Sequence, residues 1–376
     1  MNDSTRNAAG GHSLRVLAFE SYDSGSHRYV RERIDECSRH EWRWVTRPGR
    51  AWTWRMRTGA TELIKQMDEA GVTGQEAGGW VPDVIMATSL LSLGDLRAQL
   101  PPQMRSIPCM LYMHENQVAY PFRTEHGAGG ERDLQYPVTN LMSVLAADQV
   151  IWNSRWNLDS FCDGIDGVLA HCPDGTLGES VADQVRARST VMWPPVIDAG
   201  GFKAGDRVLH NVPVVVWPHR WEHDKGPDGL LDIAREARGR GHELQWILLG
   251  ESKGVCPESL ATFLQEFKSN ILHAGWVESH EQYLRMLQQA DWVLSTADHE
   301  FFGIAVAEAI LAGCLPWLPD RLSYPEITPE VAHGISPMDP PENVGSVRDA
   351  CRRHLEPCVA SRAVAELDGR ISQIAG

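Results

Sequence analysis

The chain is 376 residues long, with 43% hydrophobic and 23% charged residues, which is a globular composition with room for two domains. Its formal net charge of −15 argues against a protein that coats nucleic acid non-specifically, because binding of that kind depends on cations that neutralise phosphates. A local basic patch is compatible with this charge.

The polar N-terminal residues 1–12 contain no apolar segment, and we interpret them as a disordered tail and not as a signal peptide. No run of about 18 apolar residues occurs, so we expect no membrane span and a cytoplasmic location. The eight cysteines form no C-x-x-C pair, which favours reduced thiols in that compartment. His171-Cys172 is the nearest approach to a metal-binding cluster, and we assign no metal site.

Short apolar runs recur along the chain, each followed by a polar or glycine-rich turn and a helical pattern. The first series comprises residues 14–19, 83–88, 109–114 and 148–153, and the second comprises residues 213–218, 244–250, 291–296 and 314–319. Runs with apolar residues on both faces are typical of buried parallel strands. The helical patterns between them predict βαβ units.

A Pro- and Gly-rich stretch, residues 192–210, separates the two series. We therefore predict an α/β protein with two doubly wound, Rossmann-like domains that face a cleft, at residues 13–205 and 206–345. Residues 346–376 have a helical pattern and are expected to pack back on the first domain. In such sheets ligands bind beyond the carboxyl ends of the strands, at helix N-termini.

Two polar segments of the first domain follow predicted strands. Ser24-Gly25-Ser26-His27 is a small-residue turn before a helix, where the backbone can approach a ligand closely. The strand at 109–114 runs into four consecutive polar residues, His114, Glu115, Asn116 and Gln117. Packing does not readily explain this run, so we interpret it as part of a binding site, with a loop network or a cap as the alternative. A neutral His114 imidazole suits a hydrogen bond to a sugar.

Residues 47–60 form a local positive island. Its arginines alternate with tryptophans, and the residues concerned are Arg47, Arg50, Trp52, Trp54, Arg55 and Arg57. Arginine beside aromatic side chains suits phosphate contact combined with base stacking. The alternative is a surface loop that packs its tryptophans and pairs its arginines with nearby acids.

A basic loop follows the first strand of the second domain. Residues 217–231 place Arg220 and Lys225 before a helix, and two such cations can neutralise a diphosphate leaving group. A later strand ends in Gly250, where we expect backbone contacts to the base of a nucleotide.

The segment HEFFGIAVAEAILAGCLP, residues 299–316, contains Glu300 and Glu308 on either side of an expected helix start. The N–H groups that can bind an anion there belong to Phe302, Gly303 and Ile304. A phosphate at this point leaves both carboxylates free to accept hydrogen bonds from hydroxyls, which is the layout of a nucleotide sugar. The alternative is that Glu300 caps the helix and Glu308 is a solvated surface residue.

These second-domain residues resemble the motifs of retaining, two-domain glycosyltransferases of the GT-B fold, which use nucleotide-diphosphate sugars. The resemblance implies that Arg220 and Lys225 hold the diphosphate, with the amides of residues 303 and 304 near the phosphate. Glu300 would then bind the sugar and Glu308 the ribose. No protein nucleophile is implied, because the acceptor hydroxyl attacks the face that the diphosphate leaves and a donor phosphate oxygen takes its proton.

We expect the catalytic residues to be His114, from its place at a strand end, and Arg220, Lys225 and Glu300, by the resemblance. The expected donor-binding residues are Ser24, Gly25, Arg220, Lys225, Gly250, Phe302, Gly303, Ile304 and Glu308. We expect no metal requirement, because the two cations and the helix start already supply positive charge.

Further segments narrow the resemblance to the tRNA-queuosine alpha-mannosyltransferases. They are SYDSGSHR, the Trp-x-Trp-Arg segment, HENQ followed by Tyr-Pro, RDLQY at 132–136, residues 140–154, and HRWEHDKGP at 219–227. The resemblance implies transfer of mannose from GDP-mannose to queuosine at the wobble position of aspartate tRNA. The implied acceptor-binding residues are His27, Trp52, Arg55, Arg57, Glu115, Asn116, Gln117, Arg132 and Tyr136. The chain departs from the family's aromatic-Gly-Gly-Ser-His opening, since it has Ser24-Gly25 in place of the two glycines.

Three other functions stay open from the sequence. One is a glycosyltransferase of the same fold with a small-molecule or lipid-linked acceptor. The others are a non-catalytic nucleotide-sugar or RNA-binding module and a sugar-nucleotide epimerase. The sequence indicates no oligomeric state.

Overall fold

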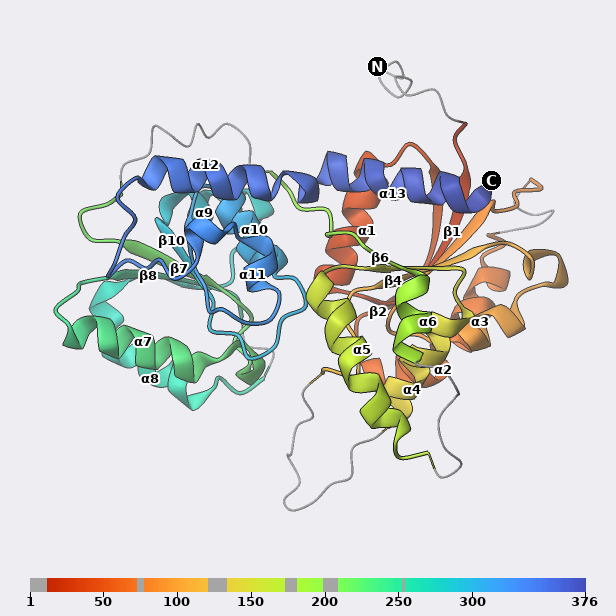
Figure 1. The fold of residues 1–376 in the computed structure, drawn as a ribbon, viewed down its shortest axis with the longest axis horizontal. Coiled ribbons are helices and arrows are strands. Elements are labelled where there is room, and N and C mark those ends of the chain that lie inside the picture. The colour runs from red at the N-terminus through yellow and green to blue at the C-terminus, as the bar shows by residue number, and fades with distance from the viewer. Residues whose placement is uncertain (1–11, 73–77, 121–133, 173–180, 199–208, 252–253) are drawn as a thin grey trace. The chain divides into compact units, whose positions relative to one another are not determined.

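The computed structural model describes residues 12–72, 78–120, 134–172, 181–198, 209–251 and 254–376. Contacts divide the chain into two compact units (Figure 1): unit 1 comprises residues 1–195 with 360–376, and unit 2 comprises residues 196–359. Each unit is an α/β structure built on one parallel sheet, as predicted. None of the helices in the described part of the chain has the length and apolar character needed to cross a membrane. The expected N-terminal tail, apart from His12, lies outside the described residues.

The sheet of unit 1 has the strand order β2-β1-β3-β4-β5-β6, with every pair parallel. The strands are β1 (Arg15–Asp23), β2 (Glu41–Pro48), β3 (Val84–Thr88), β4 (Cys109–Met113), β5 (Gln149–Trp152) and β6 (Ser189–Val191). The central strands are buried on both faces, which is why they appear as apolar runs in the sequence. β2 and β6 are absent from the predicted strands because both are edge strands with partly exposed residues.

Seven α-helices pack around this sheet in the described residues of unit 1. They are α1 (Gly25–Cys37), α2 (Trp52–Glu69), α3 (Leu93–Gln99), α4 (Gln135–Ala146), α5 (Arg155–Leu169), α6 (Val181–Ala187) and α13 (Ala360–Ala375), with a short 3-10 turn, η2 (Pro102–Met104). Serine hydroxyls fix two of the helix starts: Ser92 accepts a hydrogen bond from the backbone N–H of Asp95, and Ser154 accepts one from Asn157.

The C-terminal helix α13 packs on the first unit, as predicted. The buried Asp368 carboxylate accepts hydrogen bonds from Ser38 Oγ at 2.6 Å and from the backbone N–H of Arg39 at 2.9 Å. His40 Nε2 lies 3.1 Å from the Asp368 carbonyl oxygen. One turn of α13 therefore satisfies the polar groups that follow α1.

The expected C-terminal segment 346–376 is divided between the units. α12 (Val344–His354) belongs to unit 2, where Arg352 donates to the Leu311 carbonyl at 2.6 Å and to Asp198 at 2.6 Å. The units also separate at residues 195 and 196, ten residues before the expected boundary. The boundary lies earlier because a backbone hydrogen bond ties Val196 to unit 2: its N–H donates to the Cys358 carbonyl at 2.7 Å.

The sheet of unit 2 has the strand order β11-β10-β7-β8-β9, again with every pair parallel. The strands are β7 (Val214–Pro218), β8 (Gln245–Leu249), β9 (Ile271–Gly275), β10 (Trp292–Leu294) and β11 (Leu315–Trp317). β9 was not among the predicted strands, because this edge strand alternates half-buried and exposed residues. Several of the chain's tryptophans are core residues of the sheets, namely Trp152, Trp217, Trp246 and Trp292.

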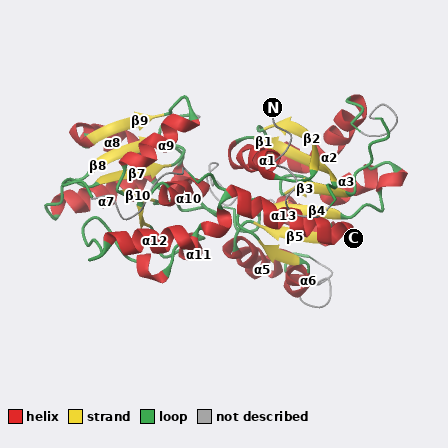
Figure 2. Cartoon of the chain, turned by 90° about the horizontal axis from the view of Figure 1, so that it is seen from above, coloured by secondary structure: helices red, strands yellow, loops and turns green. Residues whose placement is uncertain are grey.

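The helices of unit 2 cover both faces of this sheet, with α7 and α8 on one side and α9 and α10 on the other (Figures 1 and 2). They are α7 (Pro227–Gly239), α8 (Glu258–Glu266), α9 (His280–Gln289), α10 (Ile304–Leu311), α11 (Tyr324–Ile327) and α12. The described residues of this unit also contain four 3-10 turns, η4 to η7, and the first of them, η4 (His223–Lys225), immediately precedes α7. The loops after β7 and β10 lie at the carboxyl edge of the sheet.

Gly226 joins η4 to α7 at a point where no other residue fits. Its φ is +63°, and a Cβ atom there would lie 2.1 Å from the carbonyl oxygen of Thr296. We predict that Gly226→Ala lowers the free energy of unfolding by about 2 kcal/mol or more, because a positive φ and a backbone clash add. Urea denaturation followed by circular dichroism measures this change.

Gly369→Ala is the matched control. This glycine lies inside α13, and a Cβ atom there would meet nothing within 4 Å. Alanine should therefore stabilise the helix by about 0.5–1 kcal/mol. Equal effects of the two substitutions would contradict the steric argument for Gly226.

Candidate functional site

The loop after β7 carries the basic residues of the second unit. β7 ends at Pro218, and the chain continues through His219 and Arg220 into η4, which ends at Lys225. The Arg220 side chain is 50% exposed and contacts Glu222 Oε2 at 2.9 Å. Lys225 is 8% exposed. One cation is thus accessible at the rim of the loop and the other is buried beneath it.

Lys225 connects this loop to the loop after β10. Its Nζ donates to the carbonyl oxygen of His299 at 3.0 Å and lies 3.3 Å from both Glu300 Oε2 and Asp224 Oδ2. Burial alone lowers the pKa of a lysine, but Glu300 and then Asp224 outweigh it, and the pKa of Lys225 is raised. The structure therefore brings together Lys225 and Glu300, which the sequence analysis placed in one site.

Glu300 is held in its ionised form. Burial raises the pKa of a carboxyl group, but Lys225 and then His219 lower the pKa of Glu300 below its ordinary value. The side chain is 22% exposed, so the carboxylate is both charged and accessible. Such a group can accept hydrogen bonds from the hydroxyls of a ligand.

The start of α10 has the features expected for an anion-binding helix N-terminus. Gly303, with φ +92°, is the N-cap residue, and no side chain caps the helix that begins at Ile304. Phe302 is 2% exposed, so its ring belongs to the core and its carbonyl accepts a hydrogen bond from Ser323 Oγ at 2.9 Å. Only backbone N–H groups of this segment are therefore suited to contact a ligand.

Glu308 is buried inside α10 and is not a solvated surface residue. It is 4% exposed, and its Oε1 lies 3.6 Å from Nε2 of His280, the first residue of α9. The His280 side chain is 42% exposed. A buried carboxylate beside a solvent-exposed imidazole suits an interaction with hydroxyls, and His280 is a neighbour that the sequence motif did not indicate.

Gly250 has a packing reason for its identity. Its φ is +138°, and a Cβ atom there would lie 2.1 Å from the carbonyl oxygen of His219. The ends of β7 and β8 therefore approach so closely that only glycine fits. The expected contact between Gly250 and a nucleotide base stays a prediction.

His219 lies between β7 and Arg220, and the sequence analysis did not single it out. It is 5% exposed, and burial, then the Lys225 charge, lowers its pKa to about 3. Its Nε2 is buried without a hydrogen-bond partner in the described part of the chain. The sequence feature that could have indicated His219 is its position, directly after a buried strand and directly before Arg220.

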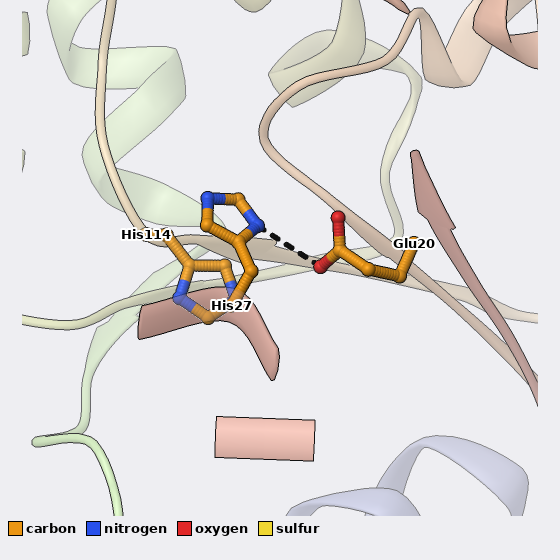
Figure 3. A group of neighbouring side chains, drawn as sticks. All are labelled: Glu20, His27 and His114. Atoms are coloured by element: carbon orange, nitrogen blue, oxygen red, sulfur yellow. Dashed lines mark hydrogen bonds and ion pairs between the residues drawn. The ribbon is translucent and has the colours of Figure 1, made fainter. Parts of the chain in front are cut away.

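In unit 1, Glu20, His27 and His114 meet at the carboxyl edge of the sheet (Figure 3). Glu20 Oε2 lies 2.9 Å from His27 Nδ1, and the two histidine rings stack with centroids 4.0 Å apart. Burial lowers the pKa of His27, but Glu20 outweighs it, and the pKa is raised. Burial and then His27 lower the pKa of His114 well below its ordinary value, so His114 is the neutral imidazole that we expected.

The rest of the polar run after β4 holds the loop in place. Asn116 has no exposed surface, and its Nδ2 donates to Asn157 at 2.8 Å and to Ser160 Oγ at 3.1 Å. The backbone N–H of Gln117 donates to Asn140 Oδ1 at 2.7 Å. The Asn116 amide is thus used within the protein, and its expected contact with the acceptor stays a prediction. Gln117, 1% exposed, donates to Glu115 at 2.9 Å, so Glu115 is the residue of this run that keeps partial exposure.

The positive island of residues 47–60 divides into buried and exposed parts. Arg55 is 6% exposed and donates to Glu62 at 2.5 Å, so it forms an ion pair within the protein, and its expected contact with the acceptor stays a prediction. Arg47 also pairs with Glu62, at 3.1 Å. Arg50 and Arg57 are exposed.

The aromatic residues of the island divide in the same way. Trp52 packs on the buried Tyr136, with ring centroids 5.1 Å apart, and Arg57 lies 5.1 Å above the same tyrosine ring. Trp54, which was not among the expected acceptor-binding residues, is 60% exposed. Arg132 lies outside the described residues. The accessible members of the island are thus Arg50, Trp54 and Arg57.

Ser24 and Gly25 form the start of α1. Gly25 has φ +52° and is exposed, with nothing within 4 Å of a Cβ atom. Ser24 is the N-cap residue, but its hydroxyl makes no capping bond. The helix start is therefore open, and the expected donor contact of these two residues stays a prediction.

Two family models match the chain. Residues 15–196 match the family model described as tRNA-queuosine alpha-mannosyltransferase N-terminal, and residues 205–335 match glycosyl transferases group 1. A GDP-mannose:cellobiosyl-diphosphopolyprenol alpha-mannosyltransferase of Xanthomonas campestris is 26% identical over 117 residues, which are 31% of each chain.

Solved structures support the fold. HepE of Anabaena in complex with UDP superposes with a TM-score of 0.56 at 15% identity, covering 96% of this chain and 97% of that one. The lipopolysaccharide outer core galactosyltransferase WaaB gives a TM-score of 0.59 at 13% identity, covering 96% and 99%. The two-domain glycosyltransferase fold of the chain, GT-B, is therefore confirmed.

The tRNA-queuosine alpha-mannosyltransferase of Drosophila melanogaster is 33% identical over 328 residues, which cover 84% of this chain and 82% of that protein. With such identity over most of both chains, this protein belongs to the tRNA-queuosine alpha-mannosyltransferase family.

Proposed function

We propose that this protein transfers mannose from GDP-mannose to queuosine at the wobble position of aspartate tRNA, with retention of configuration, in the cytoplasm. The observation that carries the proposal is the 33% identity to the Drosophila enzyme over 84% of this chain. The match to the family's N-terminal model over residues 15–196 adds to it, because that region includes the first unit's polar strand ends.

The geometry of unit 2 supports the donor half of the reaction. Arg220, Lys225 and the uncapped start of α10 supply positive charge where a diphosphate would depart. Stabilising that charge is the main requirement when no protein nucleophile takes part. The ionised Glu300 supplies an acceptor for sugar hydroxyls beside the same lysine.

The surface of α2 supports an RNA acceptor. Trp54 is 60% exposed, and a large exposed aromatic ring beside arginines is typical of sites that stack a nucleic-acid base. Arg50 and Arg57 are exposed on the same segment, while the net charge of the chain is −15. RNA contact is therefore expected to be local and confined to this basic surface.

A lipid-linked or small-molecule acceptor is the second candidate. The Xanthomonas enzyme named above uses a lipid-linked acceptor according to its name, but its match covers only 31% of the chain. One assay distinguishes the two functions. The protein is incubated with GDP-mannose and total tRNA, the tRNA is digested, and the masses of the released nucleosides are measured. A hexose mass on queuosine supports the proposal, and its absence with wild-type protein contradicts it.

We predict that Lys225→Ala lowers the rate of mannose transfer by about 10²–10³-fold, because one charge at the leaving group is lost. It also leaves the partly exposed carboxylates of Glu300 and Asp224 without their cation, so stability falls by about 1–3 kcal/mol. Arg220→Ala tests the same charge without that cost, since its side chain is 50% exposed. Initial rates with GDP-mannose, beside thermal melting curves, measure both effects.

Lys268→Ala is the control for these variants, since Lys268 is exposed in the same unit and lies in η5 (Lys268–Asn270). Its transfer rate should equal that of the wild type. Full activity of both Lys225→Ala and Arg220→Ala would remove the donor-site assignment.

We predict that Trp54→Ala weakens binding of the tRNA anticodon stem-loop by about 10-fold, since stacking on one base contributes about 1–3 kcal/mol. Arg57→Ala should weaken binding to any sequence and reduce the slope of log K against log salt by about one. Fluorescence anisotropy at several salt concentrations gives both quantities. Trp276→Ala, at a tryptophan 67% exposed in unit 2, is the control and should bind as the wild type does.

We also predict that transfer to an anticodon stem-loop persists in excess EDTA at constant monovalent salt. The physical reason is that Arg220, Lys225 and the start of α10 supply the charge that a divalent ion supplies in other transferases. A loss of activity that added Mg²⁺ or Zn²⁺ restores would show that the reaction depends on a metal.

A further inference from the structure

His27 presents a buried ring nitrogen that has no protein partner. Its Nδ1 lies 2.9 Å from Glu20 Oε2, so the carboxylate accepts the Nδ1 proton and fixes the ring. Nε2 of the same ring, in a residue 3% exposed, has no hydrogen-bond partner among the residues that the structure describes. Because an unpaired buried polar atom costs about 1–3 kcal/mol, an atom of this kind indicates a partner that binds.

Glu20 is built into the structure as the support of this ring. It is 1% exposed, and its Oε1 accepts a hydrogen bond from the backbone N–H of Tyr22 at 2.7 Å. Glu20 lies in β1, His27 in the first turn of α1, and His114 directly after β4 (Figure 3). The group therefore lies at the carboxyl edge of the first sheet, where ligands of such folds bind.

The charges around His27 favour a neutral ligand over a phosphate. The acidic groups that act on its ring are Glu20, Glu115 and Asp23, and the ring stacked on it belongs to the neutral His114. Asp23 is paired with Arg31 at 2.9 Å, and Glu20 is paired with His27 itself. An incoming phosphate would face the Glu20 and Glu115 carboxylates, whereas a hydroxyl adds no charge to a pair that is already neutral.

The same three residues do not have the geometry of a metal site. Their ligand atoms lie within 4.8 Å of one another, which brings them into the range for one ion. The rings of His27 and His114 are stacked, however, with an angle of 30° between their planes. Because a histidine lone pair lies in the plane of its ring, two stacked rings direct their lone pairs side by side and not toward one point.

We propose that the Glu20–His27 pair binds a neutral hydroxyl of the acceptor, with Nε2–H of His27 as the hydrogen-bond donor and Glu20 as the positioning residue. The inference rests on the proposed function and names its contact with the substrate. The hydroxyls concerned are those of the cyclopentenediol that distinguishes queuosine from guanosine. Unit 1 thus recognises the queuosine base through the Glu20–His27 pair and contacts the surrounding RNA through Trp54.

The test compares two anticodon stem-loops that differ only in carrying queuosine or guanosine at the wobble position. Wild-type protein should bind the queuosine RNA more tightly, and Glu20→Gln and His27→Ala should each reduce this preference by about 10-fold or more. Binding of the guanosine RNA should stay as in the wild type. In the His27→Ala background, Glu20→Gln should cost nothing further, because Glu20 acts through the histidine.

The pH dependence supplies a readout that a purely structural role would not change. The proposed donor is the protonated His27, so the preference for queuosine should hold below the pKa of His27 and fall as pH rises through it. Glu20 raises that pKa, so Glu20→Gln should move the fall to lower pH. His27→Gln, which keeps a side-chain N–H donor, should recover part of the preference without this pH dependence.

Asp83→Asn is the matched control, because Asp83 is a carboxylate of the same unit that pairs with Arg15 at 3.0 Å, before β3 and away from the carboxyl edge. It should keep the wild-type preference. An unchanged preference in folded Glu20→Gln and His27→Ala would overturn the inference while leaving the proposed function intact. If the preference for queuosine RNA disappears with EDTA and returns with Zn²⁺, the inference of a metal-free hydroxyl contact is also overturned. If the wild type neither prefers nor modifies the queuosine RNA, the proposed function itself fails.

Discussion

The carboxyl edge of the second sheet depends on one buried cation. Lys225 joins the loop after β7 to the loop after β10 through a backbone carbonyl and two acids, Asp224 and Glu300. The two carboxylates make a charged lysine tolerable at 8% exposure, and the lysine in turn keeps Glu300 ionised. The residues expected to hold the donor are therefore not independent, because Lys225 and Glu300 each stabilise the charged form of the other. The same interaction fixes the separation of two loops on which the start of α10 depends.

The first unit uses its polar residues differently. After β4, two of the four polar side chains are committed to the protein, where Asn116 is bound by the amide and hydroxyl groups of α5. We expect contacts with a ligand from His114, Glu115 and the Glu20–His27 pair. Some polar residues at a strand end are thus available to bind a ligand, and others form hydrogen bonds that fix the conformation of the loop. Sequence patterns do not separate the two uses, because both require the same residue types at the same place.

The fold and the donor loops were predictable from the sequence, and the physical reason is burial. Strands covered on both faces, such as β3 and β7, are uniformly apolar and stand out, whereas the edge strands β2 and β9 mix exposed and buried residues. Individual side chains were harder to place, because exposure is a tertiary property. Arg55 and Arg57 are two residues apart on α2, yet one is buried against Glu62 and the other is exposed. Glu20 carries no motif, since its partner is seven residues away and meets it only across a turn.

The return of α13 to unit 1 has a consequence for the order in which the protein matures. Asp368 supplies the hydrogen bonds that Ser38 and Arg39 need, but the ribosome adds it only after the whole of unit 2. Unit 1 can therefore complete its contacts only when the last residues of the chain have been synthesised. The unit whose synthesis begins first thus ends with the last helix of the chain, and until then the Ser38 hydroxyl and the Arg39 N–H lack their Asp368 partner.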